Sequence, residues 1–321
     1  MASLIFGISE YLLLLVTAAV AYTGTKVVYR LYFSPLAGFP GPHLAAATSL
    51  YEAYFDIVKG GKFMLELERL HDKYGPILRI NPHEIHIKDP SFYDTVYGGP
   101  LNKRDRLPSF IQTGLPLATF EAAPYGLHLM GIILFHLLWK PETYQKLKDE
   151  LDKAFPVLSD ADWTKLKSLP YLAAVVKEGL KISAVVTSRL PRIAPDEALH
   201  YGIWTIPPGA PVGITIHSIL RSPEVYAEPT KFIPERWIGP ADEVRLLDKY
   251  FVPFAKGNSS CMGQSMTYSW LYTVIGTVVR KFELELHETD ERNVHIVRDC
   301  FNGQTAPGLN VINVKVAKEF N

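Results

Sequence analysis

The sequence predicts a mainly α-helical fold with small β-sheets, of the α+β class, preceded by one helix that could cross a membrane. Three observations predict it. Apolar side chains recur at intervals of three and four in several stretches, short β-branched runs stand between prolines and glycines, and the chain begins with a long, nearly uncharged stretch. With 321 residues, of which 48% are hydrophobic, the chain is long enough to bury a sizeable core.

The stretch from Tyr11 to Val28 is mostly apolar and, as a helix, long enough to cross a bilayer. Glu10 precedes it, whereas Lys26 and Arg30 lie at its C-terminal end, so the positive-inside rule places the rest of the chain in the cytosol. A cleaved signal peptide or a buried helix is the alternative. The start of the chain is uncharged and the apolar run is long, so residues 1–30 are expected to be a single-pass membrane anchor. The prolines and glycines of SPLAGFPGPH make residues 31–50 the expected hinge.

Helical and strand patterns alternate through the rest of the chain. Periodic apolar residues predict four helices, over residues 61–75, 142–155, 170–181 and 266–278. The runs PILRI and IHI predict one hairpin, and the runs on either side of Pro207-Pro208-Gly209 predict a second. The segments RNVHIV (residues 292–297) and GLNVINVKV (residues 308–316) are β-like.

Charge and cysteine content narrow the class of protein. Lys plus Arg (33) equals Asp plus Glu (33), so charge gives no reason to expect a nucleic-acid partner. The two cysteines, Cys261 and Cys300, cannot form a disulfide framework, which fits reduced thiols in the cytosol.

Cys261 lies in FAKGNSSCMG, directly ahead of a predicted helix. The free N–H groups of a helix start favour an anion, so a thiolate ligand is well placed there. Gly257 and Gly263 would let the backbone approach a flat group closely. These residues alone leave alternatives open: Cys261 could be a small buried hydrophobe, or a nucleophile with His217 or His287 as its base. The spacing of zinc ligands is missing.

The loop FAKGNSSCMG resembles the haem-binding loop of the cytochrome P-450 family, F-x-x-G-x-R-x-C-x-G. Phe254, Gly257, Cys261 and Gly263 match it. FIPERW (residues 232–237) resembles the family's P-E-R-F/W segment, and KEGLKIS (residues 177–183) resembles its E-x-x-R helix. TSRLPR and the IPPG turn follow in the same order. The resemblance covers the anchor, the hinge, the KYGPILRINP region and nearly everything from Gly131 to the end, and it is closest to fungal microsomal members that oxidise secondary metabolites.

The resemblance implies a haem b cofactor whose iron has the Cys261 thiolate as its axial ligand. Phe254, Gly257 and Gly263 would shape the cofactor loop. Arg189 or Arg192 would pair with a haem propionate, although either could be an ordinary surface arginine. A buried ion-pair cluster would brace the haem-binding core, and its members are Glu178, Lys181 and Arg236.

The sequence departs from the family pattern at three places. Ser259 replaces the loop arginine, and Lys181 replaces the arginine of E-x-x-R, whose planar fork is lost. The segment from Leu115 to Met130 resembles the run into the family's third major helix, with His128 at a propionate-binding position. Gly131–Glu142 resembles the end of the long central helix instead.

The resemblance therefore implies a large central deletion, with a junction close to Met130–Gly131. The A-G-x-D/E-T-T segment, which the family uses for proton delivery, is missing, and Glu121 is followed by two alanines without hydroxyl groups. No catalytic residue is assigned. Residues 51–130 would form the N-terminal part of an incomplete P-450-like fold, and residues 131–321 its C-terminal haem-binding part.

The resemblance implies a monooxygenase of the endoplasmic reticulum membrane that hydroxylates or epoxidises a small apolar metabolite, terpenoid- or polyketide-like, with O2. Electrons would come from a separate NADPH-dependent cytochrome reductase, because the chain has no dinucleotide-binding G-x-G-x-x-G. Two alternatives remain: a truncated, inactive family member, and an anchored interaction module that has kept the scaffold and lost the chemistry.

Overall fold

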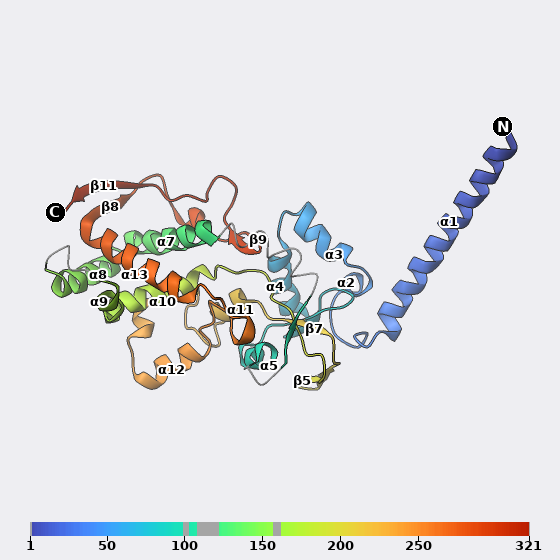
Figure 1. Ribbon diagram of the computed structural model, residues 1–321, viewed down its shortest axis with the longest axis horizontal. Helices are drawn as coiled ribbons and strands as arrows, with labels where there is room; N and C mark the ends of the chain where they lie inside the picture. Colours follow the sequence, from blue (N-terminus) through green and yellow to red (C-terminus); the bar gives the residue numbers. More distant parts are fainter. Residues whose placement is uncertain (1, 99–102, 108–121, 157–161, 321) are drawn as a thin grey trace.

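The computed structural model describes residues 2–98, 103–107, 122–156 and 162–320. A helical part contains most of the C-terminal helices, a smaller β-rich part lies beside it, and the long helix α1 (Ala2–Val28) projects from the β-rich end (Figure 1). This mixture of helices and small sheets confirms the predicted fold class.

Helix α1 continues into a π-helical turn, η1 (Tyr29–Phe33). Among the described residues, one stretch is long and apolar enough to cross a membrane: Glu10–Phe33, with a mean hydropathy of 1.6 and no part of it buried against the protein. By length and composition this stretch agrees with the expected anchor.

The main sheet joins segments that are far apart in the sequence. β1 (Ile77–Arg79) and β2 (Ile85–Ile87) pair antiparallel, which confirms the first predicted hairpin. β2 pairs parallel with β7 (Pro211–Gly213), β7 pairs with β4 (Arg192–Ile193), and β4 pairs with β3 (Asp105–Arg106). The buried isoleucines of β1 and β2 anchor one face of this sheet in the core.

The second predicted hairpin is wrong in its partners. β5 (Leu199–Tyr201) pairs with β6 (Trp204–Ile206) through a turn at Gly202, which has a φ of 55°. The Pro207–Gly209 segment carries the chain from one sheet to another, because Gly209 donates its N–H to Ala194 O (2.8 Å) and β7 joins the main sheet.

The four predicted helices are present, and each of their ends lies within three residues of the predicted end. They are α4 (Phe63–Tyr74), α8 (Pro141–Ala154), α10 (Pro170–Ser183) and α13 (Gln264–Lys281). Prolines occupy the first turns of α8 and α10, where no N–H is needed. Leucine, isoleucine and valine side chains from α8, α10 and α13 meet those of α7 (Ala122–Trp139) in one buried cluster.

Helix α7 runs without interruption through Met130 and Gly131, where the sequence places the junction of two family segments. The part of the resembling segment before Ala122, with Glu121, lies outside the described residues.

The C-terminal region contains two small antiparallel sheets. β8 (Phe282–Leu286) pairs with β11 (Val314–Glu319), and β9 (Arg298–Cys300) pairs with β10 (Asn302–Gln304). The β-like prediction for residues 292–297 is wrong. Residues Glu291–Asn293 form a 3-10 turn, η7, because the Asp290 and Asn293 side chains form a capping box around it.

Short helices complete the fold between these elements. They are α2 (His43–Ala47), α3 (Leu50–Ala53), η2 (Tyr54–Val58), η3 (Pro90–Phe92), α5 (Tyr93–Tyr97), α9 (Trp163–Lys167), α11 (Ile216–Leu220), η5 (Pro234–Trp237), α12 (Ala241–Lys249) and η6 (Gly257–Ser259).

Candidate functional site

Cys261 lies on a tight loop between η6 and the start of α13. Its N–H donates to Phe254 O (2.9 Å), which closes the loop, and the Phe254 ring packs on Tyr268 with a centroid distance of 5.4 Å. Cys261 is exposed, which is not the environment of a small buried hydrophobe. The loop therefore presents a thiol outward at the beginning of a helix.

The glycines of the loop have local reasons for being glycine. Gly257 has a φ of 71°, and a Cβ on it would lie 2.3 Å from Tyr97 O. The loop thus rests against the end of α5, where Lys256 also pairs with Asp94 (2.8 Å). A Cβ on Gly263 would lie 3.6 Å from Cys261 Sγ, an ordinary contact. Contact with α5 is sufficient to require Gly257, whether or not it also makes room for a cofactor.

Arg106 reaches the loop from β3. Its Nε donates to Ser259 Oγ (3.0 Å), so a guanidinium meets the position at which the family pattern has an arginine. Sequence reasoning missed Arg106, because a two-residue strand in a loop has no periodicity to mark it. The one available signal was Ser259. Because the family pattern has an arginine at this position, its absence indicated that an arginine from another segment could supply the positive charge.

Arg192 is the Cα partner of Arg106 across β3 and β4. Its side chain is buried and donates to the carbonyl oxygens of Leu190 and Pro191 (both 3.2 Å). Burial lowers the pKa of the Arg192 guanidinium, and the neighbouring charge of Arg106 lowers it further. In the part of the chain that the structure describes, no carboxylate forms an ion pair with either arginine. Two adjacent cations without a counter-ion favour an anion at this place.

Arg189 has a different environment. Its Nε donates to Glu84 Oε1 (2.6 Å), and its Nη2 pairs with Glu52. Two carboxylates therefore already neutralise this guanidinium, which favours a structural role. Of the two arginines considered for a propionate, Arg192 is the one with an uncompensated charge.

Glu178, Lys181 and Arg236 are brought together between α10 and η5. Glu178 Oε2 lies 3.1 Å from Arg236 Nε and accepts from Trp237 Nε1 (2.8 Å), whereas Glu178 Oε1 lies 3.3 Å from Lys181 Nζ. Glu178 and Lys181 are fully buried. Burial lowers the pKa of Lys181 to about 8, although the Glu178 carboxylate opposes this. Lys181 keeps the charge of the family arginine, and its Nζ also donates to Pro229 O (2.7 Å).

His128 lies on α7, and its Nε2 is buried without a hydrogen-bond partner among the described residues. Burial lowers its pKa, so the imidazole is neutral near pH 7. An unpaired buried ring nitrogen is costly unless something else bonds to it.

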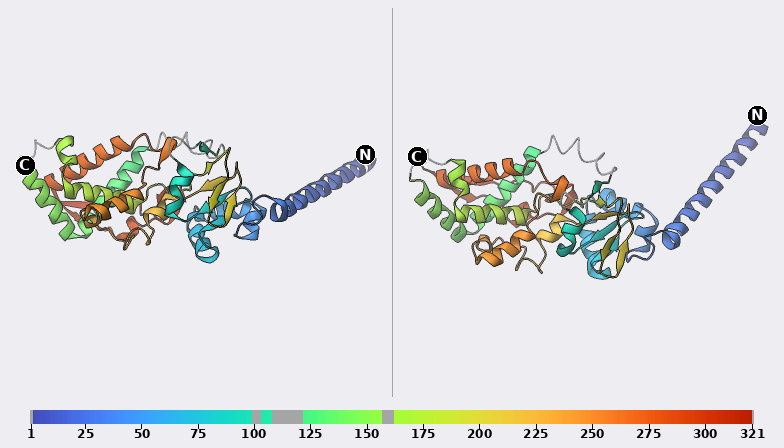
Figure 2. Two further views of the ribbon diagram at one scale, coloured as in Figure 1. Left: turned by 90° about the horizontal axis from the view of Figure 1, so that it is seen from below. Right: turned by 60° about the horizontal axis from the view of Figure 1, so that its bottom comes forward.

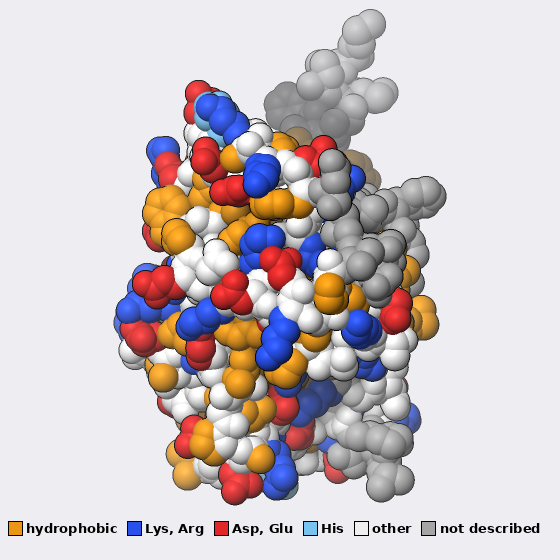
Figure 3. Space-filling model, turned by 90° about the vertical axis from the view of Figure 1, so that its left-hand side faces the viewer, with side chains coloured by type: hydrophobic (Ala, Val, Ile, Leu, Met, Phe, Trp, Pro, Cys, Tyr) orange, Lys and Arg blue, Asp and Glu red, His pale blue; other side chains and the backbone are white. Residues whose placement is uncertain are grey.

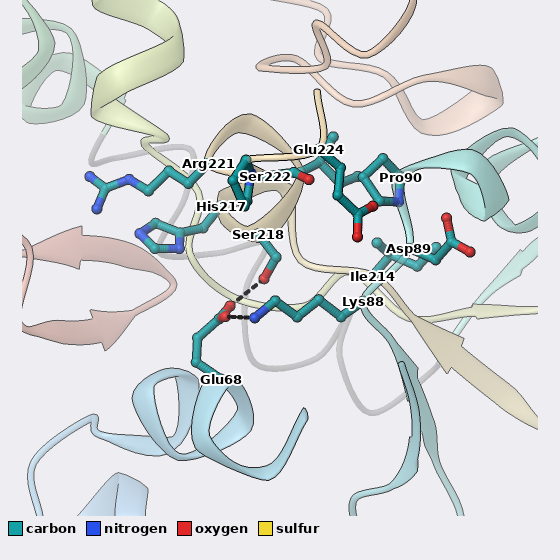
Figure 4. Close-up of a pocket in the computed structure, with 12 residues that line it drawn as sticks. Glu68, Lys88, Asp89, Pro90, Ile214, His217, Ser218, Arg221, Ser222 and Glu224 are labelled. Carbon is teal, nitrogen blue, oxygen red and sulfur yellow. Dashed lines mark hydrogen bonds and ion pairs between the residues drawn. The ribbon is translucent and has the colours of Figure 1, made fainter. Parts of the chain in front are cut away.

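The histidines considered as bases lie elsewhere. His217 is buried on α11 and lines a cavity of about 380 Å³, together with Glu68, Lys88 and Ser218 (Figure 4). His287 follows β8 and is half-buried. Neither hydrogen-bonds to Cys261 in the described ranges, and the same ranges contain no cluster of three potential metal-binding side chains. The geometry therefore gives no support for a cysteine nucleophile or a zinc site.

The donor set fits haem. An exposed thiol at a helix start can bind iron. Arg106 contacts the loop at Ser259 and Arg192 lies opposite it on β4, and these two guanidiniums, which have no ion-pair partner among the described residues, can bind the two carboxylates of the porphyrin. His128 Nε2 is a further buried polar atom, and it has no hydrogen-bond partner in the part of the chain that the structure describes.

Comparisons with known proteins agree with this chemistry. The conidiogenone synthase of Penicillium rubens is 26% identical, over 84% of this chain and 91% of that protein. A cytochrome P450 monooxygenase of Sordaria araneosa is 27% identical, over 96% of this chain and 98% of its own length, and the stellatic acid synthase of Emericella variicolor is 26% identical, over 98% and 96%.

The alignments also show how much is missing. The alignment with the Sordaria protein runs over 508 positions and this chain has 321 residues, so at least 187 positions have no counterpart here. The sequence model of the family described as "Cytochrome P450" matches residues 128–299, which is more than half of the chain and includes Cys261. This chain therefore belongs to the cytochrome P450 family, as a truncated member.

Proposed function

We propose that this chain is a membrane-anchored haem-thiolate monooxygenase whose iron is bound by Cys261. The observation that carries the proposal is the Cys261 loop: an exposed thiol, held by the bond from its N–H to Phe254 O, at the start of α13 and inside the region that matches the family.

Each residue of the site has a proposed role. Haem b, when bound, supplies the activation of O2 that monooxygenation needs. The Cys261 thiolate would hold the iron, and the N–H groups of the loop and of α13 would offset its charge. Arg192 and Arg106 would hold the propionates of a bound haem, and His128 Nε2, which has no hydrogen-bond partner among the described residues, would be a further candidate donor. The Glu178 cluster would hold α10 and η5 together.

The printed names of the relatives guide the proposal for the substrate. Their printed names describe a conidiogenone synthase, a stellatic acid synthase and a tryptophan 6-hydroxylase, all fungal. These names support a small metabolite as the substrate of this chain, and we propose that it is largely apolar and terpenoid- or polyketide-like. Electrons would come from an NADPH-dependent cytochrome reductase of the endoplasmic reticulum membrane. The apolar stretch Glu10–Phe33 supports residues 1–30 as the anchor that brings the two proteins together.

The test is the absorbance spectrum of the purified full chain after addition of haem, reduction and exposure to CO. A thiolate-shifted Soret band is expected in the wild type and in Cys300→Ser, because Cys300 is also exposed but lies on β9. The band should disappear in Cys261→Ser. A chain that takes up no haem, or a band that survives in Cys261→Ser, would overturn the proposal.

A second candidate, a truncated member that binds haem without oxidising a substrate, is favoured by the missing positions. The deleted block would leave one face of the haem open to water, which competes with productive oxidation. Reconstitution with a reductase, NADPH and substrate separates the two: a thiolate-type CO spectrum with NADPH oxidation but no oxidised product identifies the inactive form. Failure to bind haem would leave the interaction module. The division into residues 51–130 and 131–321 stays a proposal in all three cases.

A further inference from the structure

Helix α11 carries two polar side chains, His217 and Arg221, that no part of the proposed haem site uses. Helix α11 lies where the helical part of the molecule meets the β-rich part (Figures 1 and 2). The two residues are four positions apart, and both side chains extend from α11 in the same direction (Figure 4). Both line the cavity of about 380 Å³ beside this helix, which we call the α11 cavity. One water occupies about 30 Å³ in the liquid, so the α11 cavity has room for a small molecule.

The imidazole of His217 is buried without a partner. His217 is 8% exposed, and its side chain forms no hydrogen bond in the part of the chain that the structure describes. Burial lowers its pKa, and the positive charges of Arg221, His295 and Lys88 lower it further. The imidazole is therefore neutral near pH 7 and has one N–H to donate. A buried donor that stays unpaired destabilises the fold, so a ligand that accepts from it is favoured.

Arg221 is a partly buried cation that lacks a counter-ion. Its Nη2 donates to Ile182 O at the end of α10 (3.0 Å), and its Nε is buried without a hydrogen-bond partner. No carboxylate forms an ion pair with Arg221 within the described ranges. Burial lowers the pKa of the guanidinium, which the charge of Glu68 opposes, but an arginine keeps its proton at every physiological pH. An uncompensated cation in such a place favours a bound anion.

The carboxylates of the α11 cavity do not supply this counter-ion. Glu68 Oε2 lies 2.5 Å from Lys88 Nζ, so the negative charge of Glu68 is already paired. Asp89 and Glu224 lie across the α11 cavity from the Arg221 guanidinium (Figure 4). Their charges would repel a ligand with several anionic groups, which limits the occupant to a small anion. At the far end of the helical part, by contrast, cationic and anionic side chains are interspersed on the surface (Figure 3).

We propose that the α11 cavity binds a small oxyanion, a phosphate or a carboxylate group, between Arg221 and His217. A planar guanidinium matches the geometry of such a group, and the imidazole donates one further hydrogen bond. The site is separate from Arg106 and Arg192, which lie on β3 and β4, so it does not depend on haem. Because Arg221 also bonds to Ile182 O, the bound anion stabilises the connection between α11 and α10.

The experiment measures thermal unfolding of the purified full chain in detergent, in sodium phosphate, sodium acetate or sodium chloride at equal ionic strength. Phosphate should raise the Tm by about 2 °C over chloride at ten times its Kd, since only the folded state binds it. A rise in both phosphate and acetate assigns any small oxyanion, whereas a rise in one of them assigns a phosphoryl or a carboxylate ligand. Equal Tm values in all three salts would mean that the α11 cavity holds only water, and the inference would fail.

Variants locate the bound anion. Arg221→Gln should raise the phosphate concentration that gives half of the Tm shift by about tenfold, and His217→Phe should raise it by about fivefold. The matched controls are Arg106→Gln and His200→Phe, which change exposed residues on β3 and β5 and should respond as the wild type does. The general effect of phosphate on apolar burial is the same in every variant, so it cannot produce this pattern.

Two results would contradict the site. A response lost in Arg106→Gln would place the anion at the proposed haem carboxylate residues, and equal responses in the wild type, Arg221→Gln and His217→Phe would show only the general effect of the salt. If Arg221→Gln does not fold, His217→Phe decides the question, because it removes a donor without touching the bond from Arg221 to Ile182 O.

Discussion

Glu178 makes the largest number of contacts in the proposed haem-bracing cluster of Glu178, Lys181 and Arg236. It accepts from Trp237 and from the N–H of Ile233, and it forms ion pairs with two cations, of which Lys181 is fully buried. Removing one member of a buried ion cluster leaves the other charges uncompensated, which costs more than the contacts themselves contribute.

We expect Glu178→Gln to lower the free energy of unfolding by about 3 to 5 kcal/mol. Urea unfolding in detergent solution, followed by tryptophan fluorescence, measures this change, and Trp237 should report it directly. The control is Glu243→Gln on the exposed face of α12, which should leave the midpoint unchanged. Equal midpoints for the two variants would show that the cluster does not stabilise the fold.

Arg106 and Ser259 are in contact, so a guanidinium introduced at position 259 should be able to replace that of Arg106. If Arg106 holds a haem carboxylate in place of the missing loop arginine, Arg106→Gln should weaken haem affinity by about tenfold, the value of one charge-assisted hydrogen bond. Adding Ser259→Arg to this variant should restore most of the affinity. Soret titration with haem measures both, and haem dimethyl ester should not distinguish the variants because its carboxylates are blocked.

The control for this pair is Lys103→Gln, which removes a charge nearby that Asp196 already pairs with. An equal loss in Lys103→Gln would assign the effect to general electrostatics rather than to Arg106.

The site residues that sequence could find were those inside linear motifs. Cys261 and Glu178 stand at fixed distances from residues that constrain the same local backbone, so a short pattern identifies them. Arg106 and the partners of Arg189 could not be found in this way. Arg106 meets Ser259 across 153 positions of sequence, and Glu52 meets Arg189 across 137, so both contacts exist only after the chain has folded.

At the level of elements, α7 contacts α10 just after Met130–Gly131, the predicted junction of two family segments. Mutations at this contact therefore test whether the residues after the junction pack as part of helix α7. A Cβ on Gly179 would lie 2.2 Å from Ile133 Cγ1, and Ile133 is fully buried. The two helices therefore meet at a place where one side must be glycine.

We expect Gly179→Ala to destabilise the protein by about 1 to 3 kcal/mol through overpacking. Gly239→Ala, where the nearest atom would be 3.9 Å away, should change stability by less than about 0.5 kcal/mol. Combining Gly179→Ala with Ile133→Ala should cost less than the sum of the two, because the new methyl group fills space that Ile133 leaves. Thermal unfolding in detergent measures all of these, and strict additivity would mean that α7 does not pack here.

Helices were more predictable than strands because their periodicity is local. The patterns located α4, α8, α10 and α13 within a few residues of their ends. The Pro207–Gly209 turn was recognised as a turn, but its strands take partners from other segments: β6 takes β5, and β7 takes β2. Strand pairing is decided by distant residues, which a linear pattern does not contain.

At the scale of the whole molecule, residues 52–61 connect the N-terminal segment to the C-terminal hairpin β9–β10. Asp299 on β9 donates its N–H to Gly61 O (2.7 Å). The negative charges of Glu52 and Asp299 both repel the carboxylate of Asp56. Burial, with the charge of Glu52, raises the pKa of Asp56 from 3.8 to about 6.

The folded state thus binds the Asp56 proton more tightly than the unfolded state does. The stability this contributes is fully present below about pH 4 and is lost as the pH rises through 6. We expect Asp56→Asn to be more stable than the wild type at pH 7.5, by about 1 kcal/mol because Asp56 is partly screened by water, and equal to it near pH 4. Urea unfolding at both pH values measures this, with the exposed Asp242→Asn as control. A gain that does not depend on pH would exclude the carboxylate charge as its cause.

The parallel pairing of β2 with β7 has a consequence for the time course of synthesis. Ile85 finds its partner Val212 only after the ribosome has made everything between them. At translation rates of about 5 to 20 residues per second, the nascent chain waits roughly 6 to 25 s with this strand edge open. Through that interval the isoleucines of β1 and β2 are attached to the emerging chain but have no sheet to enter. We therefore expect residues 77–87 to be where a ribosome-associated chaperone binds, and to be released when residue 213 emerges.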